Sequence, residues 1–87
     1  MILRRSRSFE RDFVRLPPQI QELAEKAIQL LAENPRHPSL RVKKMKRVND
    51  VWEGRVTLAY RFTFNWEGEI ITFRKIGTHD VLKREER

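Results

Sequence analysis

Cysteine is missing from this sequence of 87 residues, and long apolar runs are missing as well. Without cysteine the chain has no disulfides, no cysteine-based zinc sites and no thiol catalysis, and it fits a reducing compartment. No apolar run approaches the roughly 18 residues that a membrane-spanning helix needs. Residues 1–12 carry charges where the apolar segment of a secretory signal peptide would lie. We therefore expect a soluble, cytoplasmic protein that makes no contact with a membrane.

Repeats, low-complexity tracts and linkers rich in glycine and serine are absent too, so residues 1–87 are expected to form a single domain. A chain of this size buries only about 60 to 65% of its unfolded surface, which allows one modest hydrophobic core. Acidic residues are in the minority, since 12 aspartates and glutamates stand against 19 lysines and arginines. The formal net charge of +7 favours an anionic partner, such as RNA, DNA or an acidic protein segment, without identifying it.

The first half of the sequence contains all four prolines and predicts two helices after a short strand at residues 2–5. Ser8 is a favourable N-cap residue, so the first helix is expected at about 8–16. A pair of prolines then breaks it, and the second of these, Pro18, suits the first turn of another helix. An Asn-Pro pair would end this second helix. Its apolar residues have the spacing of a single helix face, and they are Ile20, Leu23, Ala24, Ala27, Ile28, Leu30 and Leu31.

The second half changes to the period of a β-sheet. From residue 52 to 64 the even positions are apolar or glycine, while the odd positions are mainly polar or charged. These 13 residues exceed the common strand length of about 5 to 6, so we expect two strands with a tight connection near 57–60. If the loop has an odd number of residues, Arg55 and Arg61 lie on the same, solvent-facing side of the sheet.

A hairpin turn is predicted at residues 65–68, and a last strand at 69–76. Helices followed by a meander of strands indicate an α+β fold with the order β-α-α-β-β-β-β. Both helices are expected to pack on one face of a small, mainly antiparallel sheet. The other face is where a functional site could lie.

Residues 36–47 contain six basic residues and no acidic residue, and they lead directly into this sheet. The basic residues are Arg36, Arg41, Lys43, Lys44, Lys46 and Arg47. Two interpretations are open at this point. The run is either a solvated edge whose lysines oppose aggregation, or a surface that contacts phosphate groups.

His79 follows the last predicted strand within the sequence Ile-Gly-Thr-His-Asp. Gly77 can adopt a positive φ that turns the chain out of the strand, and Thr78 is a suitable cap for a short terminal helix, so an isolated His79 would be structural. His37 lies about forty residues away, and no metal-ligand spacing results. We expect no metal and no cofactor. The carboxylates also form no pair that suggests glycosidase or protease chemistry.

These elements, in this order, resemble the RelE/ParE superfamily of small bacterial toxins, and in particular its ribonuclease branch. The segments that carry the resemblance are NPRHPSLRVKKMK, WEGRVTLAYRFTF and IITFRKIGTHD. Within them the basic Lys-x-Lys motif, the Tyr-Arg-aromatic strand and the Gly-Thr-His ending match, and the likeness spans nearly the whole chain. It implies a small sheet with two N-terminal helices on one side and an open basic groove on the other.

The resemblance also implies a set of site residues. Lys44 and Lys46 match active-site lysines, Arg61 matches the arginine of the central strand, and His79 matches a catalytic histidine or arginine. Further RNA contacts are expected from Lys43, Arg47, Arg55 and Arg41. In this chemistry the ribose 2′-hydroxyl attacks the adjacent phosphorus without a metal. Histidine would carry a proton, and the fixed cations would stabilise charge on the phosphoryl oxygens.

The partners that the resemblance implies are a cognate antitoxin protein and mRNA, in the ribosomal A site. A shallow groove offers little readout of bases, so cleavage is expected to depend on the ribosome. Several ribonuclease members carry a Tyr or Phe after the histidine position, whereas residues 80–87 contain no aromatic residue. Two alternatives are a ParE-like toxin that inhibits DNA gyrase through protein contact, and a non-catalytic basic module that binds nucleic acid.

Overall fold

The computed structural model describes residues 1–86, which form a five-stranded sheet with helices on both faces. In chain order the elements are β1 (Ile2–Arg5), α1 (Arg7–Val14), α2 (Pro18–Glu33), the 3-10 helix η1 (Pro38–Leu40), β2 (Lys43–Lys44), β3 (Trp52–Arg55), β4 (Tyr60–Glu67), β5 (Ile70–Thr78) and α3 (Asp80–Glu85). The strand order is β1-β5-β4-β3-β2, and only β1 and β5 are parallel among these neighbours. The predicted α+β class is confirmed. Within residues 1–86 no helix is both long and apolar enough to cross a membrane.

The two N-terminal helices form where the proline pattern predicts them. Pro18 lies in the first turn of α2, which extends over the predicted range. The first helix begins earlier than predicted, because Ser6 and not Ser8 is its N-cap. The Ser6 hydroxyl accepts a hydrogen bond from the Phe9 amide (3.0 Å) and donates one to the carbonyl of Arg74 in β5 (3.1 Å). This long-range contact joins the start of α1 to the sheet.

A single hydrophobic core lies between these helices and one face of the sheet. The Phe9 ring of α1 packs 5.1 Å from the Phe73 ring of β5, and the Phe62 ring of β4 lies 5.8 Å from the same ring. α2 buries the centre of its apolar stripe, which consists of Ala24, Ala27, Ile28 and Leu31. Leu23 was expected in this stripe but is 41% exposed. It lies about 100° around the helix from Ala24, at the margin of the buried face.

The strands β3 and β4 form the first predicted hairpin. Residues 56–59 connect them, close to the predicted connection. The register places Arg55 directly opposite Arg61, so both lie on the same face of the sheet.

The second hairpin turns later than predicted. β4 continues through Glu67, and the chain reverses at Gly68 and Glu69, where Gly68 has a φ of 57°. The predicted turn at residues 65–68 is therefore wrong. Trp66 holds this part of β4 in the sheet, because its ring packs 5.1 Å from the ring of Trp52 in β3.

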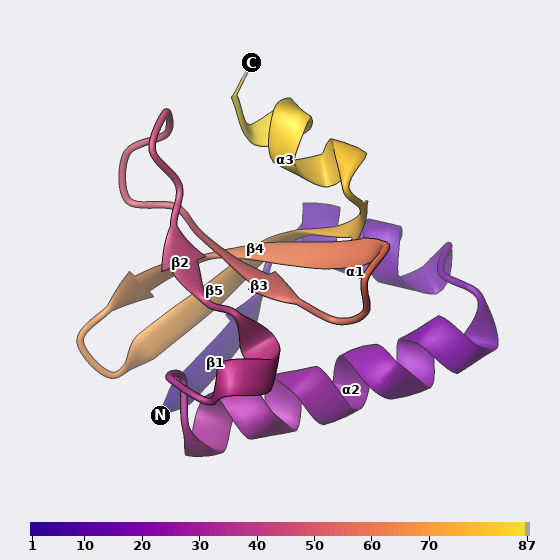
Figure 1. Ribbon diagram of the computed structural model, residues 1–87, viewed down its shortest axis with the longest axis horizontal. Coiled ribbons are helices and arrows are strands. Elements are labelled where there is room, and N and C mark those ends of the chain that lie inside the picture. Colours follow the sequence, from indigo (N-terminus) through magenta and orange to yellow (C-terminus); the bar gives the residue numbers. More distant parts are fainter. Residues whose placement is uncertain (87) are drawn as a thin grey trace.

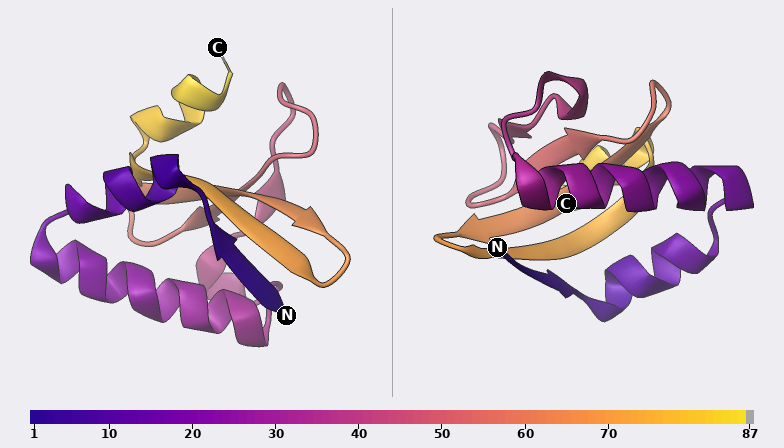
Figure 2. Two further views of the ribbon diagram at one scale, coloured as in Figure 1. Left: turned by 180° about the vertical axis from the view of Figure 1, so that it is seen from behind. Right: turned by 90° about the horizontal axis from the view of Figure 1, so that it is seen from below.

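The face of the sheet opposite the core is partly covered. In Figure 1 α2 lies below the sheet, while α3 and the loop between β2 and β3 rise above it, and the left view in Figure 2 shows the same from behind. Val81 and Glu85 of α3 are buried. Arg61 and Thr63 of β4, which were expected to face solvent, are 7% and 0% exposed. The part that stays open lies between α3 and the β2–β3 loop.

Gly54 provides a stability prediction. A Cβ atom at this position would overlap the Phe62 ring, which packs over the glycine. Gly54→Ala is therefore expected to lower the free energy of unfolding by about 1 to 3 kcal/mol, as overpacking of a core does. Urea unfolding followed by circular dichroism measures this. Gly77→Ala is the matched control, since its Cβ would make only ordinary contacts, the nearest with Arg84 at 3.7 Å. Equal stability of the two variants would contradict the packing described.

Candidate active site

Two adjoining pockets open on the face of the sheet that carries α3. The lysine pocket, of about 380 Å³, lies between α3 and the β2–β3 loop and contains Lys44 and Lys46. The arginine pocket, of about 510 Å³, lies against β3 and β4 and contains Arg55 and Arg61. His79 lines both pockets. The imidazole therefore lies where the two groups of cations meet.

The structure brings together all eight site residues that the resemblance implied. Lys43, Lys44, Lys46 and Arg47 line the lysine pocket, Arg41, Lys43, Arg55 and Arg61 line the arginine pocket, and His79 lines both. Sequence reasoning missed three charged residues in these walls, which are Glu53, Lys83 and Glu86. Lys83 lies one helical turn after His79, so assigning α3 from the sequence would have found it. Eight basic side chains against two carboxylates make this surface suitable for an anion.

Arg61 is the most buried of these cations. Its Nη1 atom donates hydrogen bonds to three carbonyl oxygens at the end of the β3–β4 hairpin, those of Thr57 (2.6 Å), Leu58 (2.8 Å) and Tyr60 (3.1 Å). Burial lowers the pKa of the Arg61 guanidinium, and the like charge of Arg55 lowers that pKa further. An arginine nevertheless stays charged at any working pH. Arg61 thus provides a positive charge that is fixed in place by the backbone.

Arg55 faces Arg61 across the two strands, and like charges in this arrangement destabilise a sheet. Within residues 1–86 the buried Nε atom of Arg55 has no hydrogen-bond partner. Glu53 offsets part of the charge, but its carboxylate also lies 4.0 Å from Lys43. A buried donor without a partner in a cationic pocket favours an anionic ligand that accepts hydrogen bonds.

His79 is exposed and occupies the N-cap position of α3. Thr78, which was considered as a cap, is the last residue of β5. The His79 side chain makes no capping hydrogen bond. The backbone therefore places the imidazole at the edge of the pockets without using its nitrogens to cap the helix.

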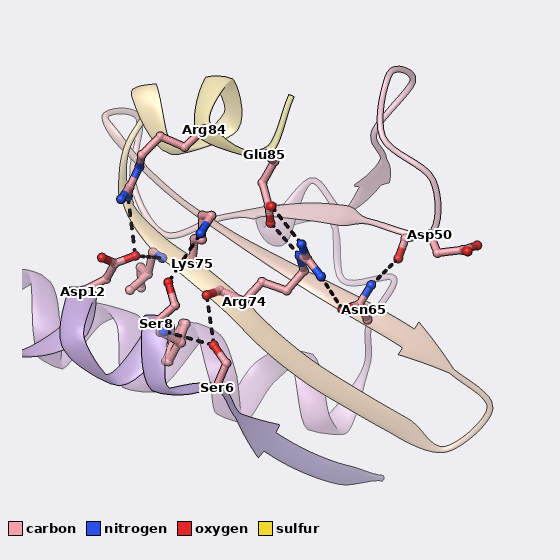
Figure 3. A network of polar contacts seen from close by, with 11 residues as sticks. Ser6, Ser8, Asp12, Asp50, Asn65, Arg74, Lys75, Arg84 and Glu85 are labelled. Carbon is pink, nitrogen blue, oxygen red and sulfur yellow. Dashed lines mark hydrogen bonds and ion pairs between the residues drawn. The ribbon is translucent and has the colours of Figure 1, made fainter. Parts of the chain in front are cut away.

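Two ion pairs anchor α3 to the rest of the fold, as Figure 3 shows. Glu85 accepts hydrogen bonds from Arg74 of β5 at 2.8 and 3.1 Å, and the Glu85 side chain is only 2% exposed. Arg84 lies 3.5 Å from Asp12 of α1. Because α3 follows His79 directly, these contacts also position the imidazole.

Glu85 provides a second prediction. Burial alone would raise the pKa of its carboxyl, but the hydrogen bond and charge of Arg74, with the charge of Lys75, lower that pKa below its ordinary value of 4.5. The ion pair therefore stabilises the fold fully above about pH 4.5, and this contribution is lost as the pH falls through the lower, folded-state pKa. Glu85→Gln is expected to cost about 1 to 3 kcal/mol near neutral pH, because Arg74 loses a charged partner.

Urea unfolding between pH 3 and 7 measures this contribution. The difference in stability between wild type and Glu85→Gln should shrink as the pH falls below 4.5. Glu22→Gln, which changes an exposed carboxylate of α2, is the control and should have little effect. If the difference in stability between wild type and Glu85→Gln stayed constant down to pH 3, the charge of Glu85 would not be what anchors α3.

His37 lies outside both pockets. Its Nδ1 atom accepts a hydrogen bond from the Ser39 amide (3.2 Å) and lies 2.8 Å from the Ser39 hydroxyl, so the ring caps η1. Within residues 1–86 no group of three or more histidine, aspartate or glutamate side chains is arranged to hold a metal ion.

Several solved structures share this arrangement of helices and strands. A YoeB/ParE toxin from Agrobacterium tumefaciens has a TM-score of 0.76 at 19% identity, over 91% of this chain and 99% of that chain. YafQ from Escherichia coli has a TM-score of 0.76 at 16% identity, over 92% and 94%. A chain of the toxin–antitoxin complex RelBE2 from Mycobacterium tuberculosis has a TM-score of 0.72 at 21% identity, over 90% and 96%. The chain has the RelE/ParE fold.

The RelE/ParE fold is the one that the sequence segments resemble, so that expectation is confirmed. At these identities the likeness concerns the fold alone. No protein-family model matches the sequence, and no curated protein matches it. One fold can host several functions, so the activity of this chain depends on the residues of the two pockets.

Proposed function

We propose that this chain is the toxin of a toxin–antitoxin pair and that it cleaves mRNA as an endoribonuclease. The observation that supports the proposal is the convergence of His79, Arg61, Lys44 and Lys46, which come from three separate segments, around two adjoining pockets. A basic surface alone would suit any polyanion. A proton carrier at the centre of that surface suits a reaction at phosphorus.

The reaction breaks one bond of the RNA backbone. The ribose 2′-oxygen bonds to the adjacent phosphorus and loses its proton, while the bond from phosphorus to the 5′-oxygen breaks and that oxygen gains a proton. The products are a 2′,3′-cyclic phosphate and a 5′-hydroxyl. His79 serves as general acid or general base, because an imidazole ring nitrogen can accept or donate a proton.

The remaining residues stabilise charge. Arg61 is held by three carbonyl oxygens, so the positive charge that meets the phosphoryl oxygens is fixed before substrate arrives, and Arg55 adds a second positive charge beside it. Lys44 and Lys46 are exposed on the other side of His79, where they dock the flanking backbone and add positive charge. Lys43, Arg41 and Arg47 extend this contact.

The proposed partners follow from the same surface. The RelBE2 structure is a complex of a toxin with its antitoxin, and by that likeness we assign this chain a cognate antitoxin. An acidic segment of such a partner would neutralise the cationic pockets. The proposed substrate is mRNA in the ribosomal A site, because the pockets carry many phosphate-binding groups and few groups that read bases.

Expression of the chain in bacterial cells tests this function. Primer extension on cellular mRNA should show new 5′-ends, and plasmid supercoiling should stay normal. Altered supercoiling with intact mRNA would instead identify a ParE-like gyrase inhibitor. Neither effect, together with RNA binding in vitro, would identify a non-catalytic module.

Ribosome dependence is a separate prediction. Purified protein should cleave mRNA bound to ribosomes much faster than the same naked mRNA, since the ribosome presents one stretch of the strand to the shallow site. The two rates are compared on a single transcript with and without ribosomes. Equal rates would show that cleavage does not depend on the ribosome. The proposed cleavage chemistry would not be affected.

A further inference from the structure

A third cleft, of about 270 Å³, lies beside the arginine pocket and has no role in the proposed chemistry. Trp52 of β3 and Trp66 of β4 line it, together with Pro35 and Pro38 of the segment after α2. We call it the tryptophan cleft. Its size suits a small planar group better than a large ligand.

The two indole rings are held in place before any ligand arrives. Their centroids are 5.1 Å apart with an angle of 62° between the planes, and the Trp66 Nε1 atom donates to the Gly68 carbonyl (3.2 Å). Both rings also pack against the hydrophobic core and are half-buried. Rigid aromatic surfaces of this kind bind flat ring systems at low entropic cost.

The charges around the tryptophan cleft are positive. Arg36 and Arg41 line it, and no carboxylate does among the residues described. Both arginines are exposed. Arg41 has a φ of 47°, in the left-handed region. A residue other than glycine adopts this conformation at an energetic cost. A ligand with an aromatic ring and a negative charge is complementary to this lining.

The tryptophan cleft meets the proposed active site at the edge of the sheet, just before β2. Arg41 and Val42 line both the tryptophan cleft and the arginine pocket. The indole rings lie on the core face of the sheet, whereas Arg55 and Arg61 lie on the opposite face. An RNA strand with a phosphate beside Arg61 can extend past Arg41, around this edge of the sheet, and bring an unpaired base further along the strand to the indole rings. A single strand offers both the phosphates that suit the cationic pockets and the planar bases that suit the indole rings.

We propose that the tryptophan cleft binds an unpaired base of the same RNA strand whose phosphate lies in the arginine pocket. This inference rests on the proposed function, because the ligand is the same RNA. Stacking of a base on an aromatic ring changes affinity by about 5- to 150-fold. The cleft would thus align the strand and place one particular phosphate beside His79.

The fluorescence of the protein reports on this cleft directly, because both tryptophans of the chain line it. The probe is a short 2′-O-methyl RNA, which the 2′-hydroxyl mechanism cannot cleave. Saturable quenching is expected with this probe, and no quenching with an abasic sugar-phosphate chain of equal length. Equal quenching by both would show that only phosphates bind, and would overturn the proposal.

Substitutions distinguish a role of the tryptophan cleft in RNA binding from a role in the stability of the fold. Trp66→Leu should weaken binding of a labelled 2′-O-methyl RNA about 5- to 150-fold, and Trp66→Phe should retain most of the affinity because the ring remains. Arg36→Gln should weaken it by several-fold without touching the core, whereas Arg11→Gln, at an exposed position on α1, should not. Unchanged affinity of Arg36→Gln and of folded Trp66→Leu would contradict the proposal.

The outcomes also distinguish this inference from the proposed function. Quenching by RNA without any mRNA cleavage in cells would support the base site and refute the ribonuclease. Cleavage without quenching would refute the base site alone. Quenching by an acidic peptide but not by RNA would also refute it, and would assign the cleft to a protein partner.

Discussion

His79→Asn is expected to reduce mRNA cleavage by about 10²- to 10⁴-fold and to abolish growth arrest, while the chain stays folded. The imidazole lies between the two groups of cations, and the proposed reaction needs a proton carrier there. Asparagine is a favoured N-cap residue, so α3 should keep its start. His79→Ala should show the same loss of activity. Primer extension on cellular mRNA and a growth assay measure both.

Asp80→Asn is the matched control for this prediction. Asp80 is the exposed first residue of α3 and lines neither pocket. Its substitution weakens an interaction with the helix dipole that is worth about 0.3 to 1 kcal/mol, which should leave cleavage intact. If the folded His79→Asn variant cleaved mRNA at the wild-type rate, His79 would have no role in the mechanism.

Arg61→Ala is expected to lose both activity and stability. The sequence pattern places Arg61 on a solvent-facing strand surface and predicts little structural damage, but the structure changes this expectation. Three carbonyl oxygens lose their donor when the guanidinium is removed, and a lost hydrogen-bond partner costs about 1 to 3 kcal/mol. Loss of the fixed charge should lower cleavage by a further factor of about 10² to 10³.

Arg61→Lys separates the two effects. Lysine keeps the positive charge but lacks the planar set of donors, so it should restore part of the activity and little of the stability. Urea unfolding and cleavage rates are measured on the same preparations, at a temperature where each variant is folded. An Arg61→Ala variant as stable as wild type would refute the contact with the hairpin, and one with undiminished cleavage would refute the phosphate contact.

Elements that local chemistry determines could be predicted from the sequence. α2 has proline at its start, an Asn-Pro pair at its end and a stripe of helical period between them, and its bounds are as predicted. The alternation after residue 52 likewise predicted β3 and β4. It left the shared face of Arg55 and Arg61 conditional on the length of the loop, and the register shows that both residues do lie on one face. The predicted site residues lie around the two pockets. Arg55 and Arg61 lie on the face of the sheet opposite the core, and residues 41–47 lie at the β2 edge of the sheet.

Features that depend on contacts between distant segments could not be predicted in this way. Ser6 and Ser8 are equally good caps locally, and the carbonyl of Arg74, 68 positions away, favours Ser6. Residues 65–67 have the composition of a turn, yet Trp66 packs on Trp52 and the strand continues. The burial of Arg61 is a local exception, because its guanidinium bonds to carbonyls of its own hairpin, which the alternation of polar and apolar residues does not reveal.

The central claim is that one phosphate of the substrate is shared by the imidazole and the guanidinium groups. A titration of the protein with 2′-O-methyl RNA, followed by nuclear magnetic resonance, tests this directly. The account predicts that the His79 ring signals and the Nε–Hε signals of Arg55 and Arg61 shift together, with one dissociation constant. Arginine signals that shift while the His79 signals stay at their free positions would contradict it.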